Sequence, residues 1–219
     1  MHLWKLVFAR TRKASLNRSS IVSASSRSRS RGFSLPELVV SLLIVVILSA
    51  IAIPTLMSSL RSYQLNDAAG RVSDMLKFTR FEAVRQNKQV NCLLQQVGGY
   101  WAVGEDRNVD LTIDPNDPQV VLTGFATLLP ASGPATTPIL NALGVGALTA
   151  LSGGPNSVTF DARGAVRVAI GGALAANVYV IFVGNAGHPE AGYRAVLLLP
   201  AGGTQVWMAP PGGTWRRMS

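Results

Sequence analysis

The hydrophobic and polar positions of the chain form successive patterns. From Leu38 to Leu60 lie 23 residues without a charged side chain, which at about 1.5 Å per helical residue can span a bilayer core. Over residues 61–86, apolar side chains return every three or four positions, which predicts an amphipathic helix whose stripe packs in a core. The expected stripe is Leu65, Ala68, Ala69, Val72, Leu76, Thr79 and Ala83. Because the two patterns are continuous, the sequence predicts one helix from about Pro36 to Gln86.

Beyond this helix, short apolar runs alternate with turn residues, which predicts β-strands. Paired glycines at 98–99, 153–154, 171–172 and 202–203 mark the turns. The expected strands are residues 89–96, 100–104, 120–129, 157–161, 165–170, 177–183, 193–199 and 204–208. We expect a long loop at 130–155, which is rich in Ala, Gly, Pro and Thr. The predicted fold is α+β, with a long N-terminal helix packed on an antiparallel β-sheet head.

A lone carboxylate stands at the entrance to the uncharged run. The boundary has the sequence Arg31-Gly32-Phe33-Ser34-Leu35-Pro36-Glu37. A carboxylate at the edge of a membrane span is costly, so Glu37 is a candidate functional residue. A helix-capping box is the alternative, because Ser34 and Glu37 have the S-x-x-E spacing. Pro36 disfavours that alternative because it pushes Leu35 out of helical geometry.

This boundary resembles the N-terminal signature of type IV pilins and type II secretion pseudopilins. Gly32, Phe33, Ser34, Leu35 and Glu37 fall on the family pattern in order, whereas Pro36 departs from the usual aliphatic residue. The resemblance implies that prepilin peptidase cuts between Gly32 and Phe33 and methylates the new amino group of Phe33. It also implies that Glu37 pairs with that amine of a neighbouring subunit during assembly. Pro54 falls where many family members carry a helix-kinking proline.

The downstream sequence resembles the GspH/FimT-like minor pilins in particular. The matching segments are Arg80–Val84 on the helix, a strand with Val90 and Cys92, the turn Phe160–Gly164, and the final hairpin Arg194–Met208 with its turn at Ala201-Gly202-Gly203. The resemblance implies four parts: a cleaved basic leader at 1–32, a transmembrane and filament-core helix at 33–60, an amphipathic helix at 61–88, and a β-rich periplasmic head at 89–219.

The positive charge of the chain is concentrated at its beginning. The formal net charge is +9, but residues 1–32 hold eight of the 20 Lys and Arg and no acid. The remainder carries 12 basic and 11 acidic residues, so the total charge does not indicate what a processed chain binds. Arg27, Arg29 and Arg31 are expected to stay cytoplasmic, which predicts a single-pass protein of the bacterial inner membrane with its head in the periplasm.

The basic leader leaves two alternatives open. An Arg- and Ser-rich beginning without acids is also typical of an organellar transit peptide, although the apolar run is too long for a secretory signal. A 32-residue leader is long beside those usual in the family. Translation starting near Leu16 or Val22 would leave a short basic leader of ordinary form.

The chain carries no motif for catalysis or for a cofactor. Because phosphate loops, dinucleotide fingerprints and nucleophile elbows are absent from the sequence, we expect no enzyme activity and no cofactor. His188 is expected in a solvated loop and the single Cys92 in the core, which leaves no metal-ligand cluster. Residues 106–117 resemble an EF-hand opening, but Leu111 replaces the required glycine, so an acidic solvated loop is the preferred interpretation.

The predicted function is that of a minor pilin or pseudopilin, a structural subunit involved in filament initiation or protein secretion. Its expected partners are prepilin peptidase, other pilin or pseudopilin subunits, the inner-membrane assembly platform and membrane lipid. The alternative is a FimT-like minor pilin that binds DNA for natural transformation. Trp215, Arg216 and Arg217 would then combine base stacking with phosphate neutralisation. Type II secretion and type IV pili share the same N-terminal chemistry, so the sequence does not separate them.

Overall fold

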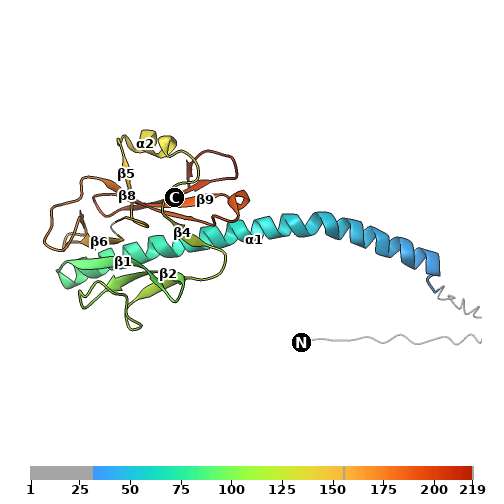
Figure 1. The fold of residues 1–219 in the computed structure, drawn as a ribbon, viewed down its shortest axis with the longest axis horizontal. Coiled ribbons are helices and arrows are strands. Elements are labelled where there is room, and N and C mark those ends of the chain that lie inside the picture. The colour runs from blue at the N-terminus through green and yellow to red at the C-terminus, as the bar shows by residue number, and fades with distance from the viewer. Residues whose placement is uncertain (1–31, 155, 219) are drawn as a thin grey trace, which may run out of the picture. The chain divides into compact units, whose positions relative to one another are not determined.

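The structure, a computed structural model, describes residues 32–154 and 156–218 (Figure 1). The expected leader lies outside the described residues except for Gly32. The chain divides into two compact units, Met1–Val45 and Val46–Ser219, which are described separately. In the first unit, residues 32–34 have no regular secondary structure and the helix begins at Leu35.

Helix α1 (Leu35–Gln86) has 52 residues and confirms the predicted long helix. Among the described residues it is the one helix long and apolar enough to cross a membrane, with a window of mean hydropathy 2.8 in which no residue is buried. Pro54 lies inside this helix, and the kink there stays a prediction. The helix ends at Gln86, because the next residue, Asn87, has a left-handed φ of 51° that stops the helical hydrogen-bond pattern.

The β-strands of the head form two sheets. Sheet A has the order β3-β2-β1-β6-β7, and every pair in it is antiparallel. Its strands are β1 (Val90–Val97), β2 (Tyr100–Asp106), β3 (Gln119–Leu122), β6 (Ser157–Phe160) and β7 (Val166–Arg167). Sheet B has the order β11-β10-β9-β8-β4, with β5 added in parallel to β8. Its strands are β4 (Thr127–Leu129), β5 (Leu148–Ala150), β8 (Val178–Gly184), β9 (Tyr193–Leu198), β10 (Thr204–Ala209) and β11 (Arg216–Arg217).

Three predicted segments differ from the structure. The single strand expected at 120–129 is two strands, β3 and β4, which belong to different sheets and are separated at Gly124, where φ is 91°. The strand expected at 165–170 is reduced to β7, because the Arg167 guanidinium donates to the carbonyl of Gly172 and closes a short turn. The loop expected at 130–155 contains helix α2 (Thr137–Leu143) and strand β5.

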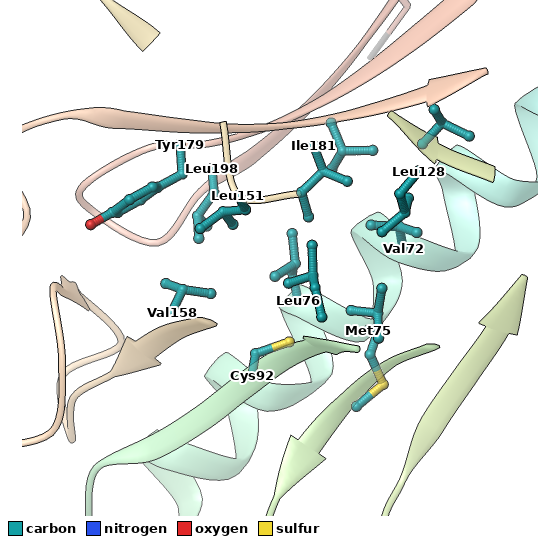
Figure 2. Close-up of a cluster of buried hydrophobic side chains, with 14 of the residues drawn as sticks. Val72, Met75, Leu76, Cys92, Leu128, Leu151, Val158, Tyr179, Ile181 and Leu198 are labelled. Atoms are coloured by element: carbon teal, nitrogen blue, oxygen red, sulfur yellow. The ribbon is translucent and has the colours of Figure 1, made fainter. Parts of the chain in front are cut away.

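The predicted stripe of helix α1 lies in the main hydrophobic core. All seven of its residues are buried, and side chains from both sheets cover them. Figure 2 shows Val72, Met75 and Leu76 of α1 between Cys92 of β1 and Ile181 of β8. The prediction for Cys92 is confirmed, since it is fully buried and desolvation raises the pKa of its thiol to about 12.

The second face of sheet B is also covered. Every residue of β8 is buried, because Tyr179 and Ile181 face the α1 core while Val180 and Phe182 face a separate cluster. Helix α2 and the C-terminal segment supply residues to that cluster, among them Ile139 and Trp215. A strand that is buried on both faces needs such a cover, which explains why 130–155 is structured.

Candidate assembly site and supporting contacts

The residues of the expected processing site lie together at the start of helix α1. Phe33 is 78% exposed, and apart from the chain neighbours no atom of the described residues lies within 4 Å of the position that a Cβ of Gly32 would occupy. The backbone N–H of Leu38 donates to the carbonyl of Ser34 over 3.1 Å, so Ser34 is the residue at which helical bonding begins. The rest of the described chain therefore does not cover the expected scissile bond.

Glu37 is exposed in the first turn of α1. Within the described part of the chain, its carboxylate accepts no hydrogen bond and forms no ion pair; only its backbone carbonyl is used, by the Ser41 hydroxyl at 2.8 Å. The capping-box alternative needs a bond between the Glu37 side chain and the backbone N–H of Ser34. That bond is not formed here, which leaves the carboxylate available to a partner.

A buried arginine joins helix α1 to sheet B. Arg194 of β9 is 1% exposed, and its guanidinium donates to the side chains of Asn66 and Ser62 on the helix and to the carbonyl of Tyr193. Desolvation lowers its pKa, and the charge of Arg216 adds to this effect. All of these acceptors are neutral. The hydrogen bonds from the guanidinium therefore hold the helix against the sheet without a carboxylate as ion-pair partner.

A second arginine joins the helix to two turns. The Arg80 Nε–H donates to the carbonyl of Gly164 over 3.0 Å. The turn at Gly202 packs against the same place, because a Cβ on Gly202 would lie 2.0 Å from the Gly164 oxygen and 2.7 Å from Arg80 Nε. The family segments that were recognised separately in the sequence, at 80–84, 160–164 and 201–203, therefore meet in one contact.

Glu82 and Arg85, three positions apart on α1, form an ion pair in which the acid is buried. Glu82 is 6% exposed, and its carboxylate accepts from Arg85 at 2.6 Å and from Gln86 at 2.8 Å. The hydrogen bond from Arg85 is the main reason why the pKa of Glu82 lies below its ordinary value. A second ion pair on α1, between Asp67 and Arg71, is exposed, with Arg71 NH1 4.0 Å from Asp67 Oδ2.

The acidic segment 106–117 is not entirely solvated as expected. Asp106 is 2% exposed, and its carboxylate accepts the backbone N–H groups of Val109, Asp110 and Leu111. Val109 and Leu111 have left-handed φ values of 63° and 65°. The carboxylate thus closes the loop on itself, and the residues that the structure describes contain no group of acids, histidines or cysteines able to hold a metal ion.

Glu105 is a buried acid that sequence reasoning missed. It is 1% exposed, its Oε1 lies 3.7 Å from Arg107 Nε, and its Oε2 has no hydrogen-bond partner among the described residues. Burial raises the pKa of Glu105; the charge of Arg107 opposes this, and that of Glu82 adds to it. No local pattern marks such a residue, because it precedes four other acids, at positions 106, 110, 114 and 117, in a segment that is polar in sequence.

The variant Glu105→Gln is expected to be more stable than the wild type at alkaline pH. The pKa of Glu105 is higher in the folded state than in the unfolded state. Its contribution to stability is therefore fully present below the unfolded-state pKa, and this contribution is lost as the pH rises through the folded-state pKa. The difference should shrink toward about pH 4, where free carboxyl groups protonate. Denaturant midpoints of the full chain in detergent, followed by tryptophan fluorescence at each pH, measure this difference.

Asp110→Asn is the control for the sign of this effect. Hydrogen bonds from the Thr112 hydroxyl and backbone N–H hold the pKa of Asp110 below its ordinary value. This variant should therefore be less stable than the wild type at neutral pH, and the loss should fade as the pH falls through the lowered pKa. A Glu105→Gln variant that tracks the wild type at every pH would contradict the prediction.

The loop histidine was expected to be solvated. The side chain of His188 is 42% exposed, and its Nδ1 lies 2.8 Å from Glu190 Oε1, which also accepts from Arg61 at 2.7 Å. The His188 ring lies 5.4 Å from that of Phe125. This small cluster connects helix α1 to the 3₁₀ turn η1 (Pro189–Ala191).

Of the three residues expected to bind DNA, the two arginines are exposed and the tryptophan is buried. Arg216 and Arg217 are exposed on β11, which pairs with β10. Trp215 is 4% exposed, and its ring lies 6.1 Å from that of Phe182 in the second core cluster. A buried indole does not offer a face for base stacking, so the structure corrects that role for Trp215.

An exposed apolar helix that continues into the core of a β head defines a class of proteins, the pilin-like subunits anchored by an N-terminal helix. The prokaryotic N-terminal methylation motif matches residues 27–53. The Type II transport protein GspH family matches residues 68–203, which is more than half of the chain. The chain therefore belongs to the GspH family.

Solved structures show likenesses at low identity. The minor pseudopilin EpsH from the type 2 secretion system of Vibrio cholerae is 10% identical, covers 71% of this chain and 97% of its own, and has a TM-score of 0.35. The type IV minor pilin FimU of Pseudomonas aeruginosa is 14% identical, covers 72% of this chain and 90% of its own, and has a TM-score of 0.33. A search of curated proteins found no match.

Proposed function

We propose that the chain is a minor subunit of a type II secretion pseudopilus or a type IV pilus, in which it supports filament initiation or secretion. The observation that carries this proposal is the order of the matches on one helix: the methylation motif at 27–53 precedes a GspH-family head that begins at residue 68, within α1. The apolar first half of α1 supplies the membrane anchor and the contact with other subunits.

The first step of the proposed function is processing at the cytoplasmic face of the inner membrane. Prepilin peptidase removes residues 1–32 and methylates the amino group of Phe33. The exposure of Phe33 and the open surroundings of Gly32 suit access by an enzyme. Cleavage also removes eight of the 20 Lys and Arg, so that the assembled subunit is nearly neutral.

The second step is docking in the membrane. Moving an unpaired carboxylate or ammonium group out of water costs free energy. An ion pair with good geometry between the two recovers much of that cost. Glu37 has no partner among the described residues, and the Phe33 amine of a neighbouring subunit would supply one. The assembly platform would bring the two subunits together, while the head stays in the periplasm and contacts other pilin-family subunits.

A gene deletion in the native host tests this proposal. Loss of the chain should reduce filament number or secretion, and expression of the full chain should restore it. Filaments sheared from complemented cells should contain the chain as a small fraction of the major subunit, as measured by quantitative mass spectrometry. Normal filaments and normal secretion in the deletion strain would contradict the proposal.

A further inference from the structure

A pocket of about 540 Å³ lies where helix α1 leaves the core. Three segments that are distant in sequence form it: the helix exit at 87–89, the turn between β6 and β7, and the segment around Leu174. A hydrogen bond from the backbone N–H of Gly171 to Gln89 Oε1, 2.7 Å long, holds the third segment against the first. The pocket is thus a built feature of the fold.

The pocket has an excess of positive charge. Lys88, Arg163 and Arg167 line it together with one acid, Asp161. The Asp161 carboxylate is already engaged, because it accepts the backbone N–H groups of Arg163 and Ala165, each at 2.9 Å, and lies 3.4 Å from Arg167 Nε. Burial opposes ionisation of Asp161, but these hydrogen bonds and the charge of Arg167 outweigh it and lower its pKa.

Two cations of the pocket are left to an outside partner. Lys88 and Arg163 are exposed, and in the described ranges 32–154 and 156–218 neither forms a salt bridge. Arg167 is fixed in place, since its NH1 donates to the carbonyl of Gly172 at 2.7 Å. A carboxylate entering the pocket would therefore meet two exposed cations and one that is already oriented.

Exposed apolar side chains surround these charges. Leu174, which lines the pocket, is 59% exposed, and Ile170, which precedes the bonded Gly171, is 43% exposed. On the helix side, Val84 is 48% exposed and its Cγ2 lies 3.3 Å from the position of a Cβ on Gly164, in the turn that lines the pocket. Apolar and arginine side chains around one pocket are typical of protein–protein interfaces.

We propose that this pocket binds an acidic side chain, flanked by apolar residues, of a neighbouring pilin-family subunit. The inference rests on the proposed function and names the chemistry of the partner. The end of α1 at Gln86, next to the pocket, lies 26 residues beyond Leu60, or roughly 39 Å at the helical rise, so anionic lipid headgroups do not reach the pocket. Nucleic acid is disfavoured because residues 33–219 carry 12 basic and 11 acidic side chains, whereas DNA binding uses an extended basic surface.

The test compares two variants with the same loss of charge. The tagged full chain is extracted from its native host in mild detergent, and the co-purified pilin-family subunits are quantified by mass spectrometry. Lys88→Gln/Arg163→Gln should recover at least about tenfold less of one such subunit than the wild type. Arg216→Gln/Arg217→Gln, which removes two exposed cations at another place on the head, should recover as much as the wild type.

Lys88→Arg/Arg163→Lys distinguishes the loss of charge from a folding defect. This variant keeps both cations and should recover as much of the pilin-family subunit as the wild type. The double reversal Lys88→Glu/Arg163→Glu should select suppressors that change an acid to Lys or Arg in the partner subunit. Equal recovery from the Gln variants, or suppressors confined to this chain, would overturn the pocket inference and leave the proposed function intact. A wild-type chain that recovers no pilin-family subunit would overturn both, and a shift of duplex DNA that requires Lys88 and Arg163 would assign the pocket to nucleic acid instead.

Discussion

Replacement of Glu37 by valine is expected to stop incorporation of the chain into filaments while its leader is still removed. The carboxylate is exposed at the start of α1 and has no partner among the described residues, and under the proposed function its partner is the Phe33 amine of a neighbouring subunit. Valine keeps an apolar helix and lacks the charge that pairs with the Phe33 amine. The amount in sheared filaments should fall by roughly a hundredfold, because loss of one member of a low-dielectric ion pair leaves the other uncompensated.

Ser41→Ala is the matched control for Glu37→Val. Ser41 lies one turn further along the same helix, and its hydroxyl only bonds back to the carbonyl of Glu37. Immunoblots of sheared filaments and of membranes measure assembly and processing of both variants. Normal incorporation of Glu37→Val would show that the carboxylate has no part in docking.

Substitution of Gly202 by alanine is expected to destabilise the head by roughly 3 kcal/mol or more, from the left-handed backbone and the steric clash together. Its φ is 81°, and the new methyl group would lie 2.0 Å from the carbonyl oxygen of Gly164. That oxygen also accepts from Arg80, so the turn has to move away and break the contact between helix and turns. Denaturant unfolding of the full chain in detergent measures the loss.

Gly203→Ala is the control that shows whether the loss of stability is specific to position 202 or follows from any glycine-to-alanine change in this turn. The nearest atom to its added Cβ is the Leu199 Cδ1 at 3.7 Å, which is ordinary contact, and its φ is not left-handed. This neighbour should unfold within about 0.5 kcal/mol of the wild type, as surface substitutions commonly do. Equal stability of the two variants would contradict the packing described for Gly202.

The long helix and its buried stripe were predictable because the signal is local and repeats. Each of the stripe residues from Leu65 to Ala83 occupies a position fixed by the helical period, and all are buried. The strands 89–96 and 177–183 were placed within one residue of β1 and β8 for a similar reason. The processing motif is also local, since residues 32–37 are contiguous.

The errors arise where long-range pairing decides the structure. A continuous apolar run at 120–129 does not reveal that β3 pairs with β2 while β4 pairs with β8. The composition of 130–155 resembles a loop, yet its strand β5 joins sheet B beside β8 and its helix α2 covers the second face of that sheet. The basic pocket draws Lys88, Arg163 and Leu174 from three separate segments, so no sequence pattern marks it.

We propose that this chain enters a filament through processing at the Gly32–Phe33 bond. The most direct measurement is mass spectrometry of the N-terminal peptide of the chain purified from cells with and without prepilin peptidase. With the peptidase, the first residue should be an N-methylated Phe33; without it, a peptide that spans Arg31, Gly32 and Phe33 should remain. An intact bond between Gly32 and Phe33 in cells that contain active peptidase would contradict the account.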